Sequence, residues 1–282
     1  MTLSDNSSKQ VLLTGGTSGI GRETVRALAT KGFRVAFTAR DLKAGYTFAE
    51  ELKKETGNTH IEVYLADLAS FASIRNFVTA FTAQHSKLDV LINNAGTWET
   101  ERSLSKDGIE TTIAVNHLAP FLLTNLLLPL LIKSAPARIV IVASALYING
   151  EINLADPQLK QNWGGVKAYS NSKLMNIYFM RELHKKLKGT GVTVNALHPG
   201  VVNTSLSRKL NFIMRWFFET FTISAAKGAK TTVYLASDPH AEGVSGEYFV
   251  KSKPEKLRAK ATDDTVAAAL WQMSEKYTGI KQ

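Results

Sequence analysis

Short apolar runs alternate along the chain with longer stretches in which apolar residues recur every three or four positions. The short runs are typical of buried strands and cover residues 11–13, 33–39, 61–66, 90–93, 138–143 and 192–196. Helical periodicity is found over residues 22–31, 71–85, 109–132 and 169–187. This alternation predicts an α/β fold with a single Rossmann-type, doubly wound parallel sheet and helices on both faces.

The predicted elements follow one another without a low-complexity linker, which favours a single domain over residues 1–282. The polar segment 1–9 is expected to be flexible. No uninterrupted apolar run reaches the ~20 residues that a membrane-spanning helix needs, and the N-terminus does not resemble a signal peptide. We therefore expect a cytoplasmic protein.

Composition narrows the class of function. The chain has no cysteine, which excludes disulfides, thiolate metal sites and cysteine nucleophiles, and its six histidines are scattered. The formal net charge is +10, but the basic residues are dispersed among amphipathic helices. Because nucleic-acid binding needs a clustered basic patch, we expect neither a nucleic-acid partner nor a metal. Attraction for an anionic cofactor and ordinary solubility account for the charge.

A glycine-rich turn follows the first predicted strand and leads directly into a predicted helix. Residues 14–21 read Thr-Gly-Gly-Thr-Ser-Gly-Ile-Gly. Glycine lets the chain turn tightly and lets the backbone approach a pyrophosphate, and a helix N-terminus favours that anion through its free N–H groups. The candidate cofactor-binding residues of this turn are Gly15, Thr17, Ser18, Gly19, Ile20 and Gly21.

The end of the second predicted strand bears on the choice of cofactor. Arg40 lies about twenty residues beyond the glycine turn, where an acidic residue would hold the 2′-hydroxyl of NAD and a basic one the 2′-phosphate of NADP. Its neighbour Asp41 could take the ribose instead, or could cap the following helix. We favour NADP(H) over NAD(H).

Tyr169 and Lys173 are four residues apart in a predicted helix. Positions i and i+4 share a helix face, so the ammonium can lie near the phenol. A phenol ordinarily titrates near ~10, and a neighbouring cation is expected to lower its pKa toward the range useful for general acid–base catalysis. Such a pair alone is more often just part of a half-exposed helix.

Polar and turn residues mark the ends of the later strands. They are Asp67 and Leu68 after the third strand, Asn93 to Gly96 after the fourth, Ser144 after the fifth, and Pro199 and Gly200 after the sixth. Each could be a simple cap or turn. Because ligands bind beyond the carboxyl ends of parallel strands, their joint occurrence predicts one cleft.

With these motifs in this order, the chain resembles the short-chain dehydrogenase/reductase family, in its retinol-dehydrogenase-like and WW-domain-oxidoreductase-like branch. The resemblance covers residues 10–279 and rests on Thr-Gly-x-x-x-Gly-x-Gly, Asn-Asn-Ala-Gly and Tyr-x-x-x-Lys. It implies an NADP(H)-dependent oxidoreductase that transfers hydride between nicotinamide and a carbonyl or alcohol carbon. The implied roles are general acid/base for Tyr169, binding of the substrate oxygen for Ser144, binding of the nicotinamide ribose for Lys173, and support of a proton-relay water for Asn116.

The resemblance also outlines the cofactor site. It places Asp67 and Leu68 at the adenine, Asn94, Ala95 and Gly96 at the adenosine ribose, and Pro199, Gly200, Val202 and Thr204 on the nicotinamide side. The chain departs from its relatives in two respects: Ala143 precedes Ser144 where many family members have paired serines, and we expect no N-terminal membrane anchor before the fold, unlike many retinol dehydrogenases. Retinoid specificity therefore does not follow from the resemblance.

Pro120 supplies an independent physical argument about Asn116. Proline has no N–H to donate to the carbonyl four residues back, so the main-chain carbonyl of Asn116 is expected to lack its helical partner. It would then bind water or another donor, as a relay residue must. A kink made only for packing is the alternative.

The segment 205–222 is expected to form a substrate lid, because this family carries its lid directly after the cofactor loop. Its apolar residues recur at helical spacing, with five aromatics among residues 206–221 and cations between them. Such a lid favours a lipophilic substrate and could contact an anionic membrane surface. A core or homodimer element is the alternative. For the whole chain, the alternative to an enzyme is a catalytically weak, NADP(H)-binding regulatory or scaffold protein.

Overall fold

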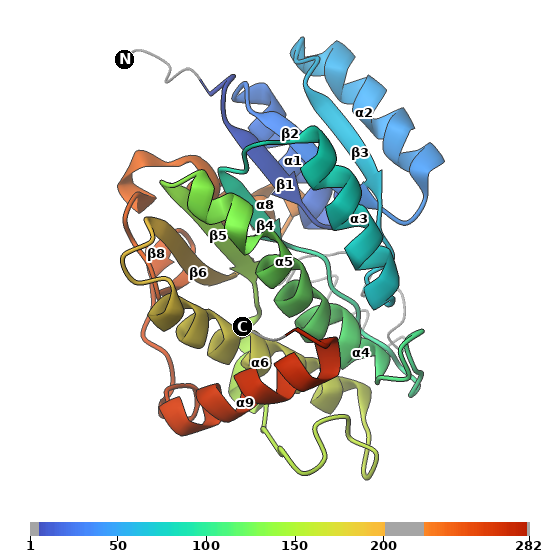
Figure 1. The fold of residues 1–282 in the computed structure, drawn as a ribbon, viewed down its shortest axis with the longest axis vertical. Helices are drawn as coiled ribbons and strands as arrows, with labels where there is room; N and C mark the ends of the chain where they lie inside the picture. Colours follow the sequence, from blue (N-terminus) through green and yellow to red (C-terminus); the bar gives the residue numbers. More distant parts are fainter. Residues whose placement is uncertain (1–5, 201–222, 281–282) are drawn as a thin grey trace.

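The computed structural model describes residues 6–200 and 223–280, which include an eight-stranded sheet with helices on both faces (Figure 1). The strands are β1 Gln10–Leu13, β2 Arg34–Ala39, β3 Ile61–Leu65, β4 Val90–Asn93, β5 Ala137–Val142, β6 Val192–His198, β7 Tyr248–Val250 and β8 Lys253–Pro254. Their order across the sheet is β3-β2-β1-β4-β5-β6-β7-β8. The order reverses between β1 and β4, which is where open α/β sheets bind ligands.

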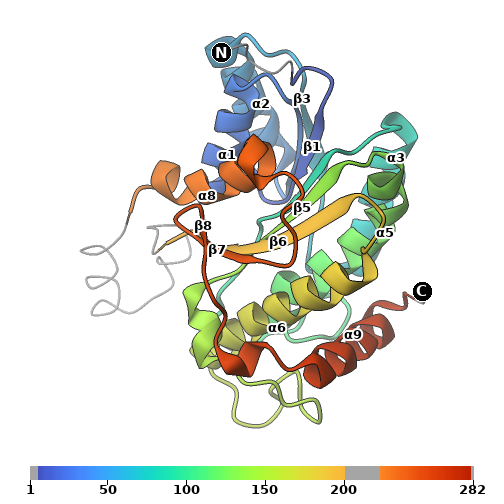
Figure 2. The same ribbon diagram turned by 90° about the vertical axis from the view of Figure 1, so that its left-hand side faces the viewer.

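The long helices form two layers on opposite faces of the sheet (Figure 2). One layer contains α1 Gly19–Thr30, α2 Leu42–Thr56 and α8 Ala225–Ser237, and the other contains α3 Phe71–Gln84, α5 Ala119–Lys133 and α6 Gly165–Lys186. The C-terminal helix α9 Asp264–Thr278 packs outside α5 and α6. Shorter helical pieces are α4 Thr111–Ile113, the π-helical turn η1 Ala114–Leu118, and the 3₁₀ turns η2 Ala145–Asn149, η4 Pro239–Ala241 and η5 Ala259–Ala261.

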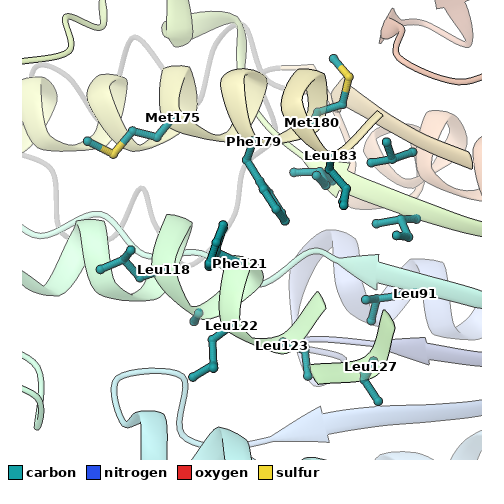
Figure 3. Close-up of a cluster of buried hydrophobic side chains, with 14 of the residues drawn as sticks. Leu91, Leu118, Phe121, Leu122, Leu123, Leu127, Met175, Phe179, Met180 and Leu183 are labelled. Carbon is teal, nitrogen blue, oxygen red and sulfur yellow. The ribbon is translucent and has the colours of Figure 1, made fainter. Parts of the chain in front are cut away.

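Two hydrophobic cores fill the space between the sheet and its helix layers. Side chains alternate between the faces of a strand, so Leu12 of β1 packs with the α3, α5 and α6 layer while Val11 and Leu13 pack with the other. In the first core the rings of Phe121 and Phe179 face each other across α5 and α6, with centroids 5.4 Å apart (Figure 3). Burial on both faces explains why the central strands read as continuous apolar runs.

The predicted fold class is confirmed, and the structure adds a short hairpin at one edge. Strands β1 to β7 pair in parallel, while β8 pairs antiparallel to β7. The connection between β7 and β8 is made by Lys251 and Ser252, with φ of 51° and 60°. Two consecutive positive φ angles are typical of the tight turns that join antiparallel strands. Strands this short give no clear periodicity, so the sequence did not indicate them.

A continuous helical stretch, Thr111–Lys133, is long and apolar enough by length and composition to cross a membrane, but 67% of its most apolar window is buried inside the structure. No other helix among the residues that the structure describes is long and apolar enough to meet this criterion. Buried polar residues, including Asn116, Thr124 and Asn125, interrupt its apolar sequence. Its burial against the sheet identifies it as a core helix.

The contribution of the buried core to stability can be tested at Leu12 of β1. Leu12 is fully buried at the centre of the sheet, whereas Leu65 on β3 is 54% exposed. We expect Leu12→Ala to lower the free energy of unfolding by about 2–5 kcal/mol, because it removes buried methyl groups and leaves a cavity. Leu65→Ala is the matched control and should change it by no more than about 0.5 kcal/mol. Chemical denaturation measures both, and equal losses would contradict this account of the core.

Candidate active site

The glycine turn between β1 and α1 has the geometry that an anion site requires. Gly15 and Gly19 have φ of 74° and 54°, a region that favours glycine. A Cβ on Gly21 would lie 2.0 Å from the carbonyl oxygen of Gly15, so helix and turn could not pack this closely with any other residue. Ser18 occupies the N-cap of α1 but makes no side-chain cap hydrogen bond, unlike the caps of α2, α3 and α8. The first N–H groups of α1 are therefore available to a phosphate.

The Asn-Asn-Ala-Gly segment after β4 is bonded directly to this turn. The hydroxyl of Thr14 accepts hydrogen bonds from the N–H groups of Asn94 and Ala95, at 3.0 and 3.1 Å. The side-chain amide of Asn94 donates to the carbonyls of Thr14 and Gly15, at 2.9 and 3.3 Å. The two predicted cofactor segments thus form one rigid unit. Asn93 has a different role, because its amide donates to Thr124 of α5 at 2.9 Å.

Arg40 and Asp41, the two candidate cofactor contacts after β2, have different roles in the structure. Asp41 is the N-cap of α2, and its carboxylate accepts from the Ala44 N–H at 3.1 Å. The capping alternative is therefore confirmed for Asp41. Arg40 is exposed beside it at the carboxyl edge of the sheet. This leaves the Arg40 guanidinium free to reach a ligand group.

Asp67 lies at the neighbouring end of β3 and carries a salt bridge that the sequence did not indicate. Its carboxylate is 2.9 Å from the ammonium of Lys106, and it also accepts from the Ala69 N–H at 3.0 Å. Burial alone would raise the pKa of Asp67, but these two donors and the Arg40 charge together hold the pKa below its usual value. The carboxylate is therefore ionised at neutral pH. Leu68, the other predicted adenine contact, is 8% exposed.

Tyr169, Lys173 and Ser144 come together where α6 passes the end of β5. The Lys173 ammonium lies 5.4 Å from the centre of the Tyr169 ring and donates to the Val142 carbonyl at 3.0 Å. Lys173 is 3% exposed, and burial lowers its pKa to about 8. The expected lowering of the Tyr169 pKa is wrong for this structure: burial raises it to about 12, against the opposing effect of a hydrogen bond with Ser144.

Asn116 connects the loop after β4 to α6. Its side-chain oxygen accepts from the Thr97 N–H at 2.7 Å, and its amide donates to the Thr97 carbonyl at 2.9 Å and to the Ser172 hydroxyl at 3.0 Å. That hydroxyl donates in turn to the main-chain carbonyl of Tyr169, at 2.7 Å. Gly96 lies against this group, because a Cβ on it would be 3.2 Å from the Asn116 side-chain oxygen and 3.5 Å from the Lys173 nitrogen. All four predicted catalytic residues are thus neighbours.

The main chain at Asn116 is not a regular α-helix. Residues 114–118 form the π-helical turn η1, in which the Ala119 N–H bonds to the Ala114 carbonyl five residues back. Pro120 is the second residue of α5, which follows this turn directly. Such π turns are frequent at functional sites. An irregular helix at this point agrees with the expectation that Pro120 removes a helical hydrogen bond. That the Asn116 main-chain carbonyl binds water or another donor stays a prediction.

Several expected site residues fall at or beyond the boundary of the described chain. Pro199 and Gly200 follow β6, and Gly200 has φ of 93° with the Ile223 side chain against it. Val202, Thr204 and the lid segment 205–222 lie outside the described residues. Conversely, the sequence reasoning missed Thr97, Trp98, Lys106 and Ser172. Thr97, Trp98 and Ser172 lie within a few residues of the recognised motifs, whereas Lys106 is ten residues beyond Gly96 and carries no such signal.

A helix N-terminus without a side-chain cap at a glycine turn, with the buried Lys173 beside Tyr169 at the same sheet edge, is typical of dinucleotide-dependent oxidoreductases. A family model described as short chain dehydrogenase matches residues 9–212. The chain therefore belongs to the short-chain dehydrogenase/reductase family, in its retinol-dehydrogenase-like group, and is an oxidoreductase. The resemblance inferred from the sequence motifs is confirmed.

Individual relatives support this assignment. Retinol dehydrogenase 14 from Homo sapiens is 43% identical over 295 residues, covering 96% of this chain and 87% of that protein. A crystal structure of an uncharacterized protein from Mycobacterium paratuberculosis has a TM-score of 0.80 at 32% identity, covering 100% and 98% of the two chains. The NADP active-site complex of Pseudomonas aeruginosa RhlG has a TM-score of 0.71 at 27% identity, covering 86% and 93%.

The buried ammonium of Lys173 predicts a pH-dependent stability. Its pKa is about 8 in the folded chain and near ~10.4 when unfolded, so between these values the unfolded chain binds more protons and stability rises with pH. Below pH 8 the ammonium is charged in both states, so the folded chain carries the full free-energy penalty of burying that charge. We therefore expect the free energy of unfolding of Lys173→Met minus that of the wild type to decrease between pH 8 and pH 10, by roughly 2–3 kcal/mol at most, because the wild type gains stability as the ammonium loses its proton.

Urea denaturation at stepped pH measures this difference. Lys167→Met is the matched control, because Lys167 is exposed on the same helix and stays in water in both states. A Lys173→Met difference that is independent of pH would contradict the burial of a titrating ammonium.

Proposed function

We propose that this protein is an NADP(H)-dependent oxidoreductase that transfers hydride between nicotinamide and the carbonyl or alcohol carbon of a lipophilic small molecule, with Tyr169 as general acid/base. The observation that carries the proposal is the meeting of Tyr169, Ser144 and the buried Lys173 ammonium at the sheet edge where α1 presents its uncapped N-terminus. A proton donor, a hydroxyl for the substrate oxygen and an anion site are thereby brought together.

The chain's own groups account for the proton transfer. The Ser144 hydroxyl, 7% exposed, is hydrogen-bonded with the phenol and can hold the substrate oxygen beside it. With its pKa at about 12, the Tyr169 phenol is protonated at neutral pH, which is the form that donates a proton to a carbonyl oxygen during reduction. Lys173, with a pKa of about 8, remains largely charged at neutral pH. Its ammonium favours the phenolate that forms when the proton leaves.

The cofactor assignment rests on the glycine turn and on Arg40. Bound NADP(H) would supply the hydride donor or acceptor and, when oxidised, a cationic ring. The N-terminus of α1 would hold its pyrophosphate, and the exposed Arg40 guanidinium would pair with the 2′-phosphate. Asp67, ionised beside Arg40, would contact the adenosine. The RhlG structure, which contains NADP, supports the choice of NADP over NAD.

The lipophilic substrate class is supported by the relatives named retinol dehydrogenase, since retinol is a lipophilic alcohol. The aromatic composition of segment 205–222 supports the same class. We propose that this segment is the lid, and that any peripheral membrane or homodimer contact is made through it; these proposals rest on its sequence alone.

Tyr169→Phe tests the chemistry, because it keeps the ring and removes the ionisable hydroxyl. We expect kcat to fall by ~10²–10⁴-fold with little change in NADPH affinity. Tyr178→Phe is the matched control: it removes a hydroxyl from the same helix, where Tyr178 donates to the Lys260 carbonyl. NADPH oxidation is followed by absorbance with aldehydes and ketones of increasing chain length. Near-normal kcat in Tyr169→Phe would exclude the proposed role, and best turnover of small polar carbonyls would exclude the lipophilic class.

Arg40→Ala tests the cofactor. Loss of a charge-assisted hydrogen bond should weaken NADPH binding by about 1.5–3 kcal/mol, roughly 10- to 150-fold, while NADH binding hardly changes. Arg34→Ala provides the control, because Arg34 begins β2 whereas Arg40 follows its other end. Fluorescence titration with each nucleotide measures the affinities. Equal weakening for both nucleotides, or a wild type that prefers NADH, would overturn the assignment.

A further inference from the structure

We propose that Trp98 is a positioning residue that holds the ring of Tyr169 in its reactive orientation by stacking on it. This inference rests on the proposed role of Tyr169 as general acid/base. The two rings have centroids 4.7 Å apart and planes inclined by 19°. This separation lies in the range of favourable aromatic pairs, and near-parallel rings are characteristic of stacking. Trp98 is 9% exposed, so the indole is itself part of the interior.

The indole is fixed from two directions. Trp98 follows Thr97, whose N–H and carbonyl are both bonded to the Asn116 side chain at 2.7 and 2.9 Å. On the other side, the first residue of α6 packs against the same loop: a Cβ on Gly165 would lie 2.3 Å from the Glu99 carbonyl and 3.1 Å from the Trp98 indole nitrogen. The indole therefore has little freedom to leave the Tyr169 ring.

Stacking supplies a constraint that the helix alone does not. The Ser172 hydroxyl bonds the main-chain carbonyl of Tyr169, which fixes the backbone but leaves the side-chain torsions free. Ser144 restrains the phenol oxygen, and the Lys173 ammonium stands 5.4 Å from the ring centre. The indole adds a surface that sets the ring plane and keeps water from one of its faces. Small misplacement of a reacting group can cost 10²-fold in rate, so a loose ring should lower kcat.

Three substitutions separate this role from a merely structural one. Trp98→Ala removes the stacking surface, and Trp98→Phe keeps an aromatic face of smaller area. Trp163→Phe is the matched control, because Trp163 lies in the loop before α6, donates to the Glu110 carboxylate at 3.2 Å and makes no described contact with Tyr169. None of the three changes a residue proposed to touch substrate or cofactor.

Steady-state kinetics with NADPH and the best carbonyl substrate provides the first readout. We expect Trp98→Ala to lower kcat by about 10- to 100-fold with an almost unchanged KM for NADPH, Trp98→Phe to restore kcat to within about threefold of wild type, and Trp163→Phe to leave it unchanged. A kcat within twofold of wild type in Trp98→Ala would overturn the proposal. So would a Trp98→Phe variant as impaired as Trp98→Ala.

A second readout needs no activity, so it tests the stacking even if the proposed function fails. The tyrosinate absorption of the cofactor-free protein is titrated with and without Tyr169→Phe, and the difference isolates Tyr169. Among the described residues, the polar groups next to Tyr169 or Trp98 include Lys173 on α6, Ser144 at the end of β5 and Glu99 beside Trp98. These groups stay in place in every variant. We expect Trp98→Ala to lower the ionisation pH by about one unit and Trp98→Phe to restore it; an unchanged ionisation pH in Trp98→Ala overturns the proposal.

Discussion

The hydroxyl of Thr14 is the contact on which the rest of the site depends. It stands at the end of β1 and accepts two N–H groups from the loop after β4, at the position where the strand order reverses. The glycine turn and the Asn-Asn-Ala-Gly loop are thereby brought so close that a Cβ on Gly15 would lie 3.0 Å from the Cβ of Ala95. Parallel sheets leave a crevice at such a switch point. Here the two chain segments beside the switch point are held together by hydrogen bonds of Thr14 and Asn94.

A line of hydrogen bonds continues from this loop to α6, the helix that carries Tyr169 and Lys173. It runs through Thr97 and Asn116 to Ser172 and ends at the main chain of Tyr169. Every member is a polar group held by another, as buried polar networks require. Lys173 lies beside this network and is less well satisfied. Its buried ammonium has one hydrogen-bond acceptor among the described groups, the Val142 carbonyl, so its burial costs stability. Active sites commonly retain such unfavourable groups at the expense of stability.

The sequence predicted those features that depend on local periodicity or on short motifs. The first six strands, the glycine turn, the Tyr169–Lys173 pair and the residues at the strand ends lie where they were predicted, because alternating buried strands and helices leave a clear pattern. Features that depend on the environment could not be predicted in the same way. The Tyr169 pKa rises because burial outweighs the hydrogen bond with Ser144, and the sequence does not show burial of a single ring. Likewise, Lys106 reaches Asp67 from a loop thirty-nine residues away.

The π-helical turn that carries Asn116 packs against α9. His117 is fully buried, and its Nε2 lies 2.9 Å from the hydroxyl of Ser274 on α9, 157 residues later. That hydroxyl already donates to the Leu270 carbonyl, so the imidazole must donate to it. Trp271 of the same helix packs edge-on against Phe121 at 4.9 Å. The position of the turn that carries Asn116 therefore depends on packing against a helix that lies more than 150 residues further along the sequence, outside every segment that forms the site itself.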